Sequence, residues 1–245
     1  MDLDAHRPPT APDARRAALT ALIDHAPLFP PASLTVPDAI DEDRRAREDE
    51  HAWMLARLVW PASRLDELEG EDRALSVLLD GPYEGDMRAD AVETRWDAGL
   101  DGLSAEAYVE LPLGDGLEAK VAALAERGLR AKVRCGGAEV PSAEALGRFL
   151  DVCRGAGVPF KATAGLHHPL AGEGRHGFLN VLAACAFEDA AALTERVELD
   201  AAALRWRDRE AGAGELERVR REQLVAVGSC SFFEPVDDLK ELGIL

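Results

Sequence analysis

Residues 129–165 read LRAKVRCGGAEVPSAEALGRFLDVCRGAGVPFKATAG, in which a helical segment separates two short apolar runs. Residues 131–134 (AKVR) and 159–163 (PFKAT) are runs of the kind expected in buried strands. Residues 142–154 have helical spacing between them, with Ser142 as the N-cap. A strand, a helix and a second strand in this order predict a right-handed crossover between parallel strands of one sheet.

The same alternation continues on both sides of this unit. We predict further strands at 58–60, 74–79, 107–111 and 224–227, and helices at 89–98, 116–127, 176–193, 215–223 and 236–242. Residues 197–208 are expected to form a short hairpin or an irregular excursion. The first interpretation is an α/β fold with a (β/α) barrel, complete or irregular, and the alternative is an open doubly wound parallel sheet. Both folds bind ligands at the carboxyl ends of their strands.

The N-terminal part of the chain has a different pattern. Residues 14–25 have helical spacing, a proline-rich connector follows, and a charge-dense helix is predicted from Pro37 or Asp38 to about residue 58. We therefore expect residues 1–56 to form a helical, proline-linked extension. Residues 57–245 are expected to form a single α/β domain.

Composition limits the class of protein and its partners. The 245 residues are 47% hydrophobic and carry a formal net charge of −18, with a pI near 4.7. An acidic surface repels nucleic-acid phosphates and anionic lipid, so we expect neither as a partner. The four cysteines form no CxxC pair, and no stretch of about 18 apolar residues occurs. These features favour a cytoplasmic protein that is not embedded in a membrane, and a homo-oligomer is left open.

Charged side chains stand inside three consecutive predicted strands: Glu110, then Lys132 and Arg134, then Lys161. Because strand side chains alternate, Lys132 and Arg134 face one way, and Lys161 and Thr163 share a face. Burying such ions is costly unless they are paired or bind a ligand. One glutamate among three cations predicts a local positive excess, which a small anionic molecule would neutralise. The alternative is an internal salt-bridge network with no ligand.

The first functional hypothesis is an enzyme of lyase or isomerase type that acts on a small carboxylated or phosphorylated metabolite. Lys161 is its candidate base or imine-forming amine, because a desolvated lysine can lose its proton. Glu110 and one of the adjacent His167 and His168 are the candidate proton carriers. The candidate substrate-binding residues are Lys132, Arg134, Gly136, Gly137, Thr163, His176, Gly228 and Ser229. The glycines among them belong to turns after strands, where backbone N–H groups can surround an anion.

Two other hypotheses stay open. In one, Glu110, a loop histidine and His176 bind a divalent metal for hydrolase or lyase chemistry, whereas the first hypothesis predicts no cofactor. In the other, the chain is a non-catalytic ligand-binding or scaffold protein whose strand-end charges satisfy one another. The sequence contains no Walker A motif, no GxGxxG and no GxSxG, so nucleotide binding has no positive support.

Three runs in the C-terminal half, KVRCGG, FKATAGLHHPL with HGFLN, and GSCSFFEPVDDLKELG, resemble a family of uncharacterised bacterial proteins. The KATAGLHHP and GSCSFxEP patterns are its most specific parts, and no activity is assigned to that family. The resemblance implies a shared core that includes Lys132, Arg134, Lys161, His167, His168, His176, Asn180, Ser229 and Glu234. The run KATAG is also similar to the strand end that carries the lysine of class I aldolases.

Overall fold

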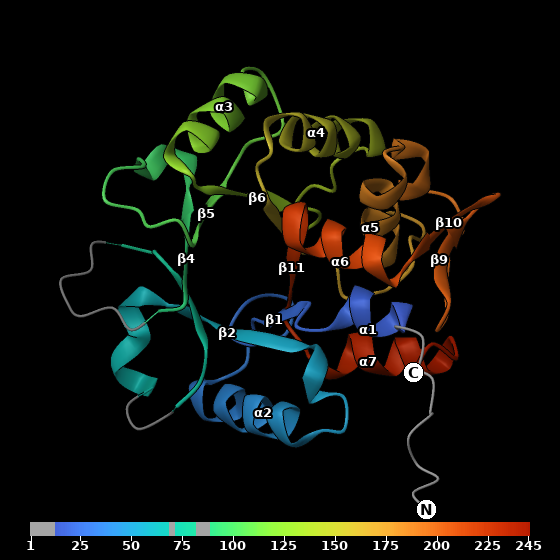
Figure 1. Ribbon diagram of the computed structural model, residues 1–245. Helices are drawn as coiled ribbons and strands as arrows, with labels where there is room; N and C mark the ends of the chain where they lie inside the picture. Colours follow the sequence, from blue (N-terminus) through green and yellow to red (C-terminus); the bar gives the residue numbers. More distant parts are fainter. Residues whose placement is uncertain (1–12, 69–71, 82–88) are drawn as a thin grey trace, which may run out of the picture.

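The computed structural model describes residues 13–68, 72–81 and 89–245, and in them eight parallel strands close into a barrel with helices outside (Figure 1). This is an α/β fold similar to a TIM barrel, as the first interpretation predicted. The strands, in order around the barrel, are β1 (Ile23–His25), β2 (Leu55–Pro61), β3 (Leu75–Leu78), β4 (Ala91–Arg95), β5 (Ala107–Glu110), β6 (Arg130–Arg134), β7 (Phe160–Thr163) and β11 (Leu224–Ser229).

The strand–helix–strand unit at the centre of the sequence forms as expected. Strands β6 and β7 pair in parallel, with Lys132 beside Lys161, and helix α4 (Ala143–Ala156) connects them. Ser142 caps α4 by accepting a hydrogen bond from the Ala145 amide, and Gly157 ends it in the left-handed region with φ 64°. Phe160 points out of the barrel and packs edge-to-face on Phe149 of α4, with ring centroids 5.3 Å apart. Alternation along β7 therefore turns its neighbour Lys161 into the barrel.

Helices cover the barrel unevenly. Helix α2 (Val36–Glu48) follows β1, and α3 (Leu117–Arg127) and α4 cover the side of β5 and β6 (Figure 1). Helices α5 (Phe178–Phe187) and α6 (Ala213–Glu222) lie between β7 and β11, and α7 (Phe233–Glu241) follows β11. In the described part of the chain, the connections after β2 and β4 contain the 3-10 turns η2 (Ala62–Leu68) and η3 (Trp96–Ala98) in place of longer helices. The barrel is thus irregular on the β2–β4 side.

The N-terminal segment belongs to the barrel, which differs from the expected extension over residues 1–56. Helix α1 covers only Ala14–Leu19, and β1 follows it and pairs with both β11 and β2. The turn between them contains Ala21 with a positive φ of 47°. The helix predicted from Pro37 or Asp38 to residue 58 ends at Glu48, the 3-10 turn η1 (Ala52–Met54) follows, and β2 begins at Leu55. Residues 1–12 of the expected extension lie outside the described residues.

One predicted helix is wrong. Residues 89–98 form β4 and the short turn η3, and β4 pairs in parallel with β3 and β5. The β-branched Val92 and Thr94 fit this pairing better than a helix. The alternation also turns Glu93 to the interior, where it is 2% exposed. This misassigned strand carries the central acid of the site described below.

A small antiparallel sheet is inserted between α5 and α6, beyond the 3-10 turn η4 (Ala190–Leu193). Its strands are β8 (Glu198–Leu199), β9 (Ala203–Trp206) and β10 (Arg209–Gly212). Strands β8 and β9 fall within residues 197–208, where a short hairpin or an irregular excursion was expected, and β10 extends the sheet beyond that range. Trp206 packs against Phe187 of α5, with ring centroids 5.8 Å apart, so the insertion joins the main hydrophobic core.

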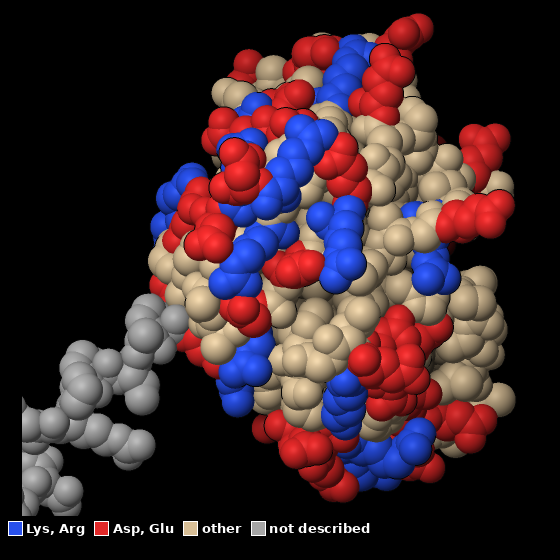
Figure 2. All heavy atoms as spheres, turned by 90° about the vertical axis from the view of Figure 1, so that its right-hand side faces the viewer, with Lys and Arg blue, Asp and Glu red and all other residues tan. Residues whose placement is uncertain are grey.

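On the face shown in Figure 2, basic and acidic side chains are interspersed, with apolar and neutral residues between them. Among the described residues, no helix is both long enough and apolar enough to cross a membrane.

Candidate active site at the carboxyl end of the barrel

An uninterrupted chain of ion pairs crosses the barrel interior. The Lys161 amine lies 2.6 Å from Asp24 Oδ2 and 2.5 Å from Glu93 Oε1. Lys132 lies 3.0 Å from Glu93 Oε2 and 3.1 Å from Glu110 Oε2. Asp24, Lys161, Glu93 and Lys132 are between 0% and 5% exposed, whereas the Glu110 side chain, at 20%, is the most accessible member. We call this set, Asp24–Lys161–Glu93–Lys132–Glu110, the buried ion chain.

Each member comes from a different strand, and the register of the barrel brings them together. Lys132 is paired in register with both Glu110 and Lys161, so β5, β6 and β7 supply one layer of side chains. Asp24 of β1 and Glu93 of β4 reach this layer from the other strands. Ser76 of β3 donates a hydrogen bond of 2.7 Å to Glu93 Oε1. Barrel interiors are filled by such layers of side chains, which are usually apolar, so an ionic layer is unusual.

The charges of this layer differ from the predicted positive excess. Asp24 and Glu93, neither of which was among the predicted site residues, add two carboxylates to Glu110. The buried ion chain therefore holds three acids and two amines. Arg134, which is exposed at the end of β6, adds a cation near the opening.

The ion pairs determine the protonation of the central residues. Burial favours the neutral amine of Lys161, but the charges of Asp24 and Glu93 outweigh it and raise the Lys161 pKa. Burial alone would raise the pKa of Glu93, but Lys161 and Lys132 lower it strongly. Lys161 is consequently an ammonium at neutral pH, and Glu93 is a carboxylate. An amine or base role for Lys161 then requires that its proton first move to Asp24 or Glu93, the two acceptors in contact with it.

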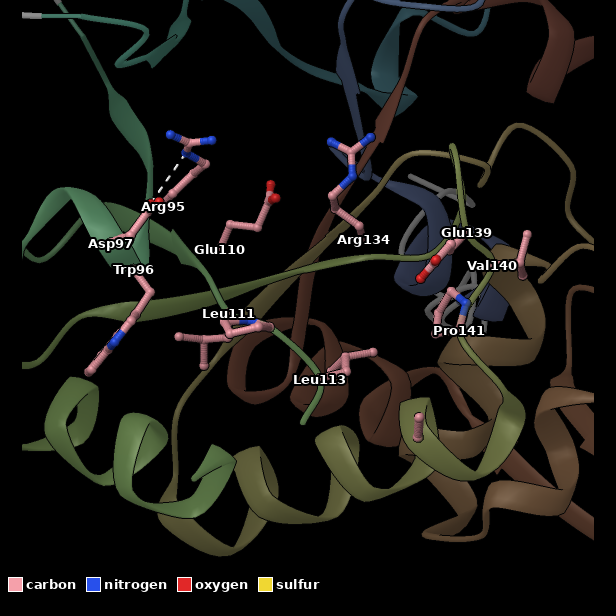
Figure 3. Close-up of a pocket in the computed structure, with 12 residues that line it drawn as sticks. Arg95, Trp96, Asp97, Glu110, Leu111, Leu113, Arg134, Glu139, Val140 and Pro141 are labelled. Carbon is pink, nitrogen blue, oxygen red and sulfur yellow. Dashed lines mark ion pairs between the residues drawn. The ribbon is translucent and has the colours of Figure 1, made fainter. Parts of the chain in front are cut away.

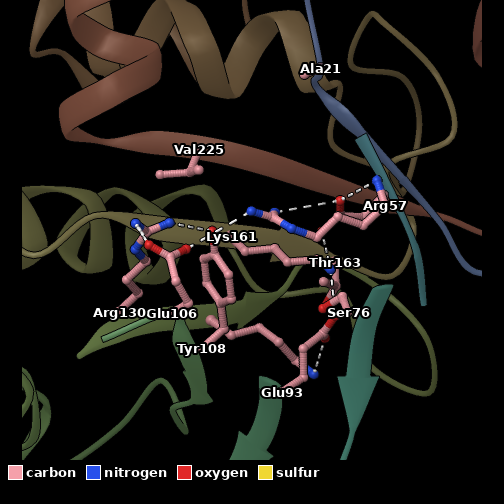
Figure 4. Close-up of polar contacts among 12 residues, drawn as sticks. Ala21, Arg57, Ser76, Glu93, Glu106, Tyr108, Arg130, Lys161, Thr163 and Val225 are labelled. Atoms are coloured by element: carbon pink, nitrogen blue, oxygen red, sulfur yellow. Dashed lines mark hydrogen bonds and ion pairs between the residues drawn. The ribbon is translucent and has the colours of Figure 1, made fainter. Parts of the chain in front are cut away.

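A second group of polar side chains surrounds Asp24 and Lys161 of the buried ion chain, toward the amino ends of the strands (Figure 4). The backbone N–H of Arg57 donates to Asp24 Oδ1 at 3.2 Å, and the Arg57 guanidinium lies 3.9 Å from that carboxylate and from Glu106. Arg130 donates to the Tyr108 hydroxyl at 2.8 Å, and the Tyr108 ring centroid lies 6.0 Å from the Lys161 amine. These contacts hold Asp24 and Lys161 in one orientation.

A cavity of about 500 Å³ opens above the buried ion chain at the carboxyl ends of the strands. Its polar wall comes from β4, β6, β7 and the loop after β7, and its members are Glu93, Lys132, Arg134, Lys161, Thr163 and His167. Five of these six were predicted site residues. The cavity therefore lies where both predicted architectures place a ligand.

Glycines bring the loops of the polar wall together. After β7, Ala164 and Gly165 have positive φ angles of 57° and 73°. A Cβ added at Gly136, in the loop after β6, would lie 2.9 Å from the Gly165 Cα. A Cβ at Gly137 would lie 3.0 Å from the Arg134 guanidinium, and one at Gly228 would lie 3.0 Å from Thr163 Cγ2. At Gly136 a Cβ would force the Gly165 backbone to shift, whereas at Gly137 and Gly228 the neighbouring side chain would have to move. The predicted anion turn at Gly136 and Gly137 thus adjoins the cavity.

Of the two adjacent loop histidines, only His167 lines the cavity. Its Nδ1 lies 3.2 Å from Ser229 Oγ, whose hydroxyl donates to the Ser231 carbonyl at 2.6 Å. Since that hydroxyl proton is already engaged, His167 Nδ1 donates to Ser229, which leaves Nε2 unprotonated in the neutral ring. Burial lowers the His167 pKa, so the ring is neutral at pH 7. The Cys230 sulfur lies 3.5 Å from the same Nδ1.

The other predicted histidines have structural contacts outside this cavity. His168 Nδ1 lies 2.6 Å from Asp238 of α7, and His176 is 5% exposed with its Nε2 2.8 Å from the Pro141 carbonyl. Asn180 accepts from the Ala171 amide and fixes the loop that follows β7. Among the described residues, no group of three or more His, Cys, Asp or Glu side chains is arranged to hold a metal ion. Glu110, the loop histidines and His176 therefore do not form the alternative metal site.

A second hollow of about 530 Å³ lies beside the cavity, over the ends of β4 and β5 (Figure 3). Arg95, Glu110 and Arg134 form its polar side, while Trp96 and Leu113 belong to its apolar floor. Arg95 also lies 3.4 Å from Asp97. Arg134 lines both hollows, so its guanidinium can contact a ligand placed in either of them.

Sequence reasoning missed Asp24 and Glu93. Asp24 stands in a strand of three residues, which is too short for a readable alternation. Glu93 is flanked by the β-branched Val92 and Thr94, and this local signal for a strand was available. The structure identifies both acids as site residues because they form ion pairs with Lys161 and, for Glu93, also with Lys132.

The fold and the site define an α/β barrel protein with a buried ion chain beneath a carboxyl-end cavity. Neither the protein-family models nor the curated proteins contain a match to this chain. The resemblance of KATAGLHHP and GSCSFxEP to an uncharacterised bacterial family therefore stays a prediction.

Proposed function

We propose that this protein is an enzyme of lyase or isomerase type that moves a proton next to the carbonyl group of a small anionic metabolite. The observation that carries the proposal is the buried ion chain at the base of an accessible cavity. Replacing buried ion pairs by apolar residues is often neutral or stabilising, so a five-membered chain is poorly explained by stability alone. Groups with strongly perturbed pKa values in a cleft are typical of catalytic sites.

The chemistry assigns different roles to the members of the site. The Lys161 ammonium lies where it would stabilise the negative charge that develops on a carbonyl oxygen. His167, neutral and with Nε2 free of a proton, is the candidate that takes the proton from carbon, and Glu110 is the accessible carboxylate for the second transfer. Arg134, with Lys132 and the glycine turns, is the candidate binding group for the substrate anion.

The imine version of the proposal uses Lys161 as a nucleophile. The Lys161 proton first moves to Asp24 or Glu93, which lie 2.6 and 2.5 Å away. The free amine then attacks the substrate carbonyl, and the oxygen leaves as water. Asp24 and Glu93 are close enough to accept this proton, but their charges stabilise the ammonium, so substrate binding must supply the free energy of the transfer. Lys132, 3.0 Å from Glu93, is the neighbouring cation.

Deuterium exchange tests the proton transfer without knowledge of the product. The protein is incubated in D₂O with a panel of anionic aldehydes and ketones, both carboxylates and phosphates, and exchange at the carbon beside the carbonyl is followed by NMR. We expect exchange with at least one compound, and a loss of about 100-fold or more in Lys161→Met and His167→Gln. Lys240→Met, on the exposed surface, is the matched control. Full exchange rates in both site variants would contradict the proposal.

Borohydride trapping distinguishes the imine version. The chain contains four lysines, of which Lys120 and Lys240 lie outside the barrel interior and serve as internal controls. With a compound that undergoes exchange, the imine version predicts a reduced adduct at Lys161 by mass spectrometry and none at the two control lysines. Absence of the adduct with that compound leaves the proton-transfer version and removes the imine.

A further inference from the structure

The wall of the cavity is divided into two chemically different halves. On the β1–β3 half, the lining residues are Ala26, Phe29, Pro30, Pro31, Val59 and Leu78. On the β4–β7 half stand the ionisable residues described above. These halves are contiguous arcs of the barrel, because β1, β2 and β3 are neighbours, as are β4, β5, β6 and β7. A ligand in the cavity therefore meets an apolar surface on one side and ions on the other.

The apolar arc offers little to a hydroxyl group. Its side chains have no hydrogen-bonding atoms, and Pro30 and Pro31 also lack a backbone N–H. A sugar hydroxyl placed against this arc would lose its hydrogen bonds to water without replacement. A methyl, branched alkyl or phenyl group would instead be removed from water there, which favours binding by roughly fourfold for each buried methylene.

The ionisable residues of the β4–β7 half, which we call the polar arc, favour a ligand with one negative charge over a ligand with two. The buried ion chain contains three carboxylates and two lysines, so with the Arg134 guanidinium its formal charge is zero. Among the described residues of the cavity wall, Arg134 is the arginine whose fork matches one carboxylate. A phosphate dianion beside it would also meet the negative charge of Glu93 in this wall.

We propose that the substrate is a 2-oxo acid with a branched or aromatic hydrocarbon body, held with its carboxylate at Arg134, its carbonyl over Lys161 and its body against Phe29 and Leu78. This inference rests on the proposed function and names its substrate class. The sequence left phosphorylated metabolites open beside carboxylated ones, and the apolar arc disfavours those that carry several hydroxyl groups, such as sugar phosphates.

Calorimetric titration of the full chain tests the division of the cavity. The probes are pyruvate, 2-oxobutanoate, 3-methyl-2-oxobutanoate, 4-methyl-2-oxopentanoate and phenylpyruvate, with glyceraldehyde 3-phosphate and ribose 5-phosphate as the polar counterparts. We expect affinity to rise roughly fourfold for each added methylene up to 4-methyl-2-oxopentanoate. The sugar phosphates are expected to bind at least tenfold more weakly than that compound. Equal affinities along the series, tighter binding of a sugar phosphate, or no binding of any oxo acid would each overturn the inference.

Variants of the apolar arc give the second arm. Leu78→Asn and Phe29→Asn are expected to weaken the binding of 4-methyl-2-oxopentanoate and phenylpyruvate by about tenfold. The affinity for pyruvate should change by no more than about twofold. Leu242→Asn, at a side chain that is 47% exposed and does not line the cavity, is the control and should leave the series unchanged. Using two separate positions protects the test if one variant fails to fold. An unaltered series in a folded Leu78 or Phe29 variant would also overturn the inference.

Deuterium exchange separates this inference from the proposed function. If oxo acids bind in the expected order but none exchanges, the substrate class of the cavity stands and the proposed function fails. If a sugar phosphate exchanges and binds more tightly than the oxo acids, the proposed function stands and the inference fails.

Discussion

Replacing Lys161 by methionine removes the centre of the buried ion chain and should destabilise the protein strongly. The substitution preserves most of the side-chain volume but leaves Asp24 and Glu93 without the amine that lies 2.6 and 2.5 Å from them. Glu93 keeps Lys132 and Ser76, and Asp24 keeps the Arg57 amide. Removing one partner of a buried ion pair typically costs about 3–5 kcal/mol of unfolding free energy. For a domain of this size that corresponds to a fall in Tm of about 6–20 °C.

The pH dependence of this loss follows from the two pKa shifts. Glu93 has a lowered pKa, so its contribution to stability is present above its ordinary pKa of 4.5 and is lost as pH falls through the lowered value. Lys161 has a raised pKa, so its contribution is complete below 10.5 and is lost only as pH rises through the raised value. The difference between wild type and Lys161→Met should therefore be largest near pH 7. It should shrink toward pH 4, where Glu93 of the variant, which has lost the lowering effect of Lys161 on its pKa, takes up a proton.

Urea unfolding followed by circular dichroism at pH 7 and pH 5 measures the effect, with Lys240→Met as a surface control expected to lie within about 0.5 kcal/mol of wild type. The double variant Lys161→Met with Asp24→Asn restores the formal charge of the chain and should be more stable than the single variant. A loss in Lys161→Met no larger than that of the control, or one unchanged between the two pH values, would refute a coupled buried chain.

Three further predictions concern other parts of the molecule. Gly136→Ala forces a Cβ to 2.9 Å from the Gly165 backbone and should cost about 1–3 kcal/mol of unfolding free energy, measured by urea unfolding. Gly155→Ala, in helix α4 and with nothing within 4 Å of the added Cβ, should stabilise by about 0.5–1 kcal/mol in the same assay. A small alkylating reagent at pH 8 should modify Cys230 first, because it lines the cavity. Burial raises the pKa of Cys230 too, but it raises those of Cys135 and Cys185 to about 12, and peptide mapping that shows another thiol reacting first would contradict this. Burial alone would lower the pKa of His25, but the carboxylates of Asp43 and Glu42 raise it, so the charged ring stabilises the fold fully below pH 6.5 and this contribution is lost as pH rises through the raised pKa. The Tm measured from pH 6 to 9 should therefore decline less in His25→Gln than in wild type. Parallel Tm curves for the two proteins would disprove this role of His25.

The sequence alone predicted parallel strands joined by helices, with a barrel preferred to an open sheet, and it predicted the charged residues of β5, β6 and β7. Residues 129–165 contain a helical period between two strand periods, and local sterics and burial make such patterns readable without tertiary information. The period of two along β6 and β7 was sufficient to turn Lys132 and Lys161 toward the same interior. Glu110, on the neighbouring strand, joined them as predicted.

Only the tertiary structure decided what the lysines face. Closing the barrel brings β1, a strand of three residues, between β11 and β2, and so delivers Asp24 to the Lys161 amine. The pairing of β4 with its neighbours overrides the helical interpretation of residues 89–98 and turns Glu93 inward. Nothing local distinguishes His167 from His168, because the difference is that one ring meets Ser229 and the other meets Asp238 of α7. These partners are distant in the chain, and the protonation of each site residue depends on them.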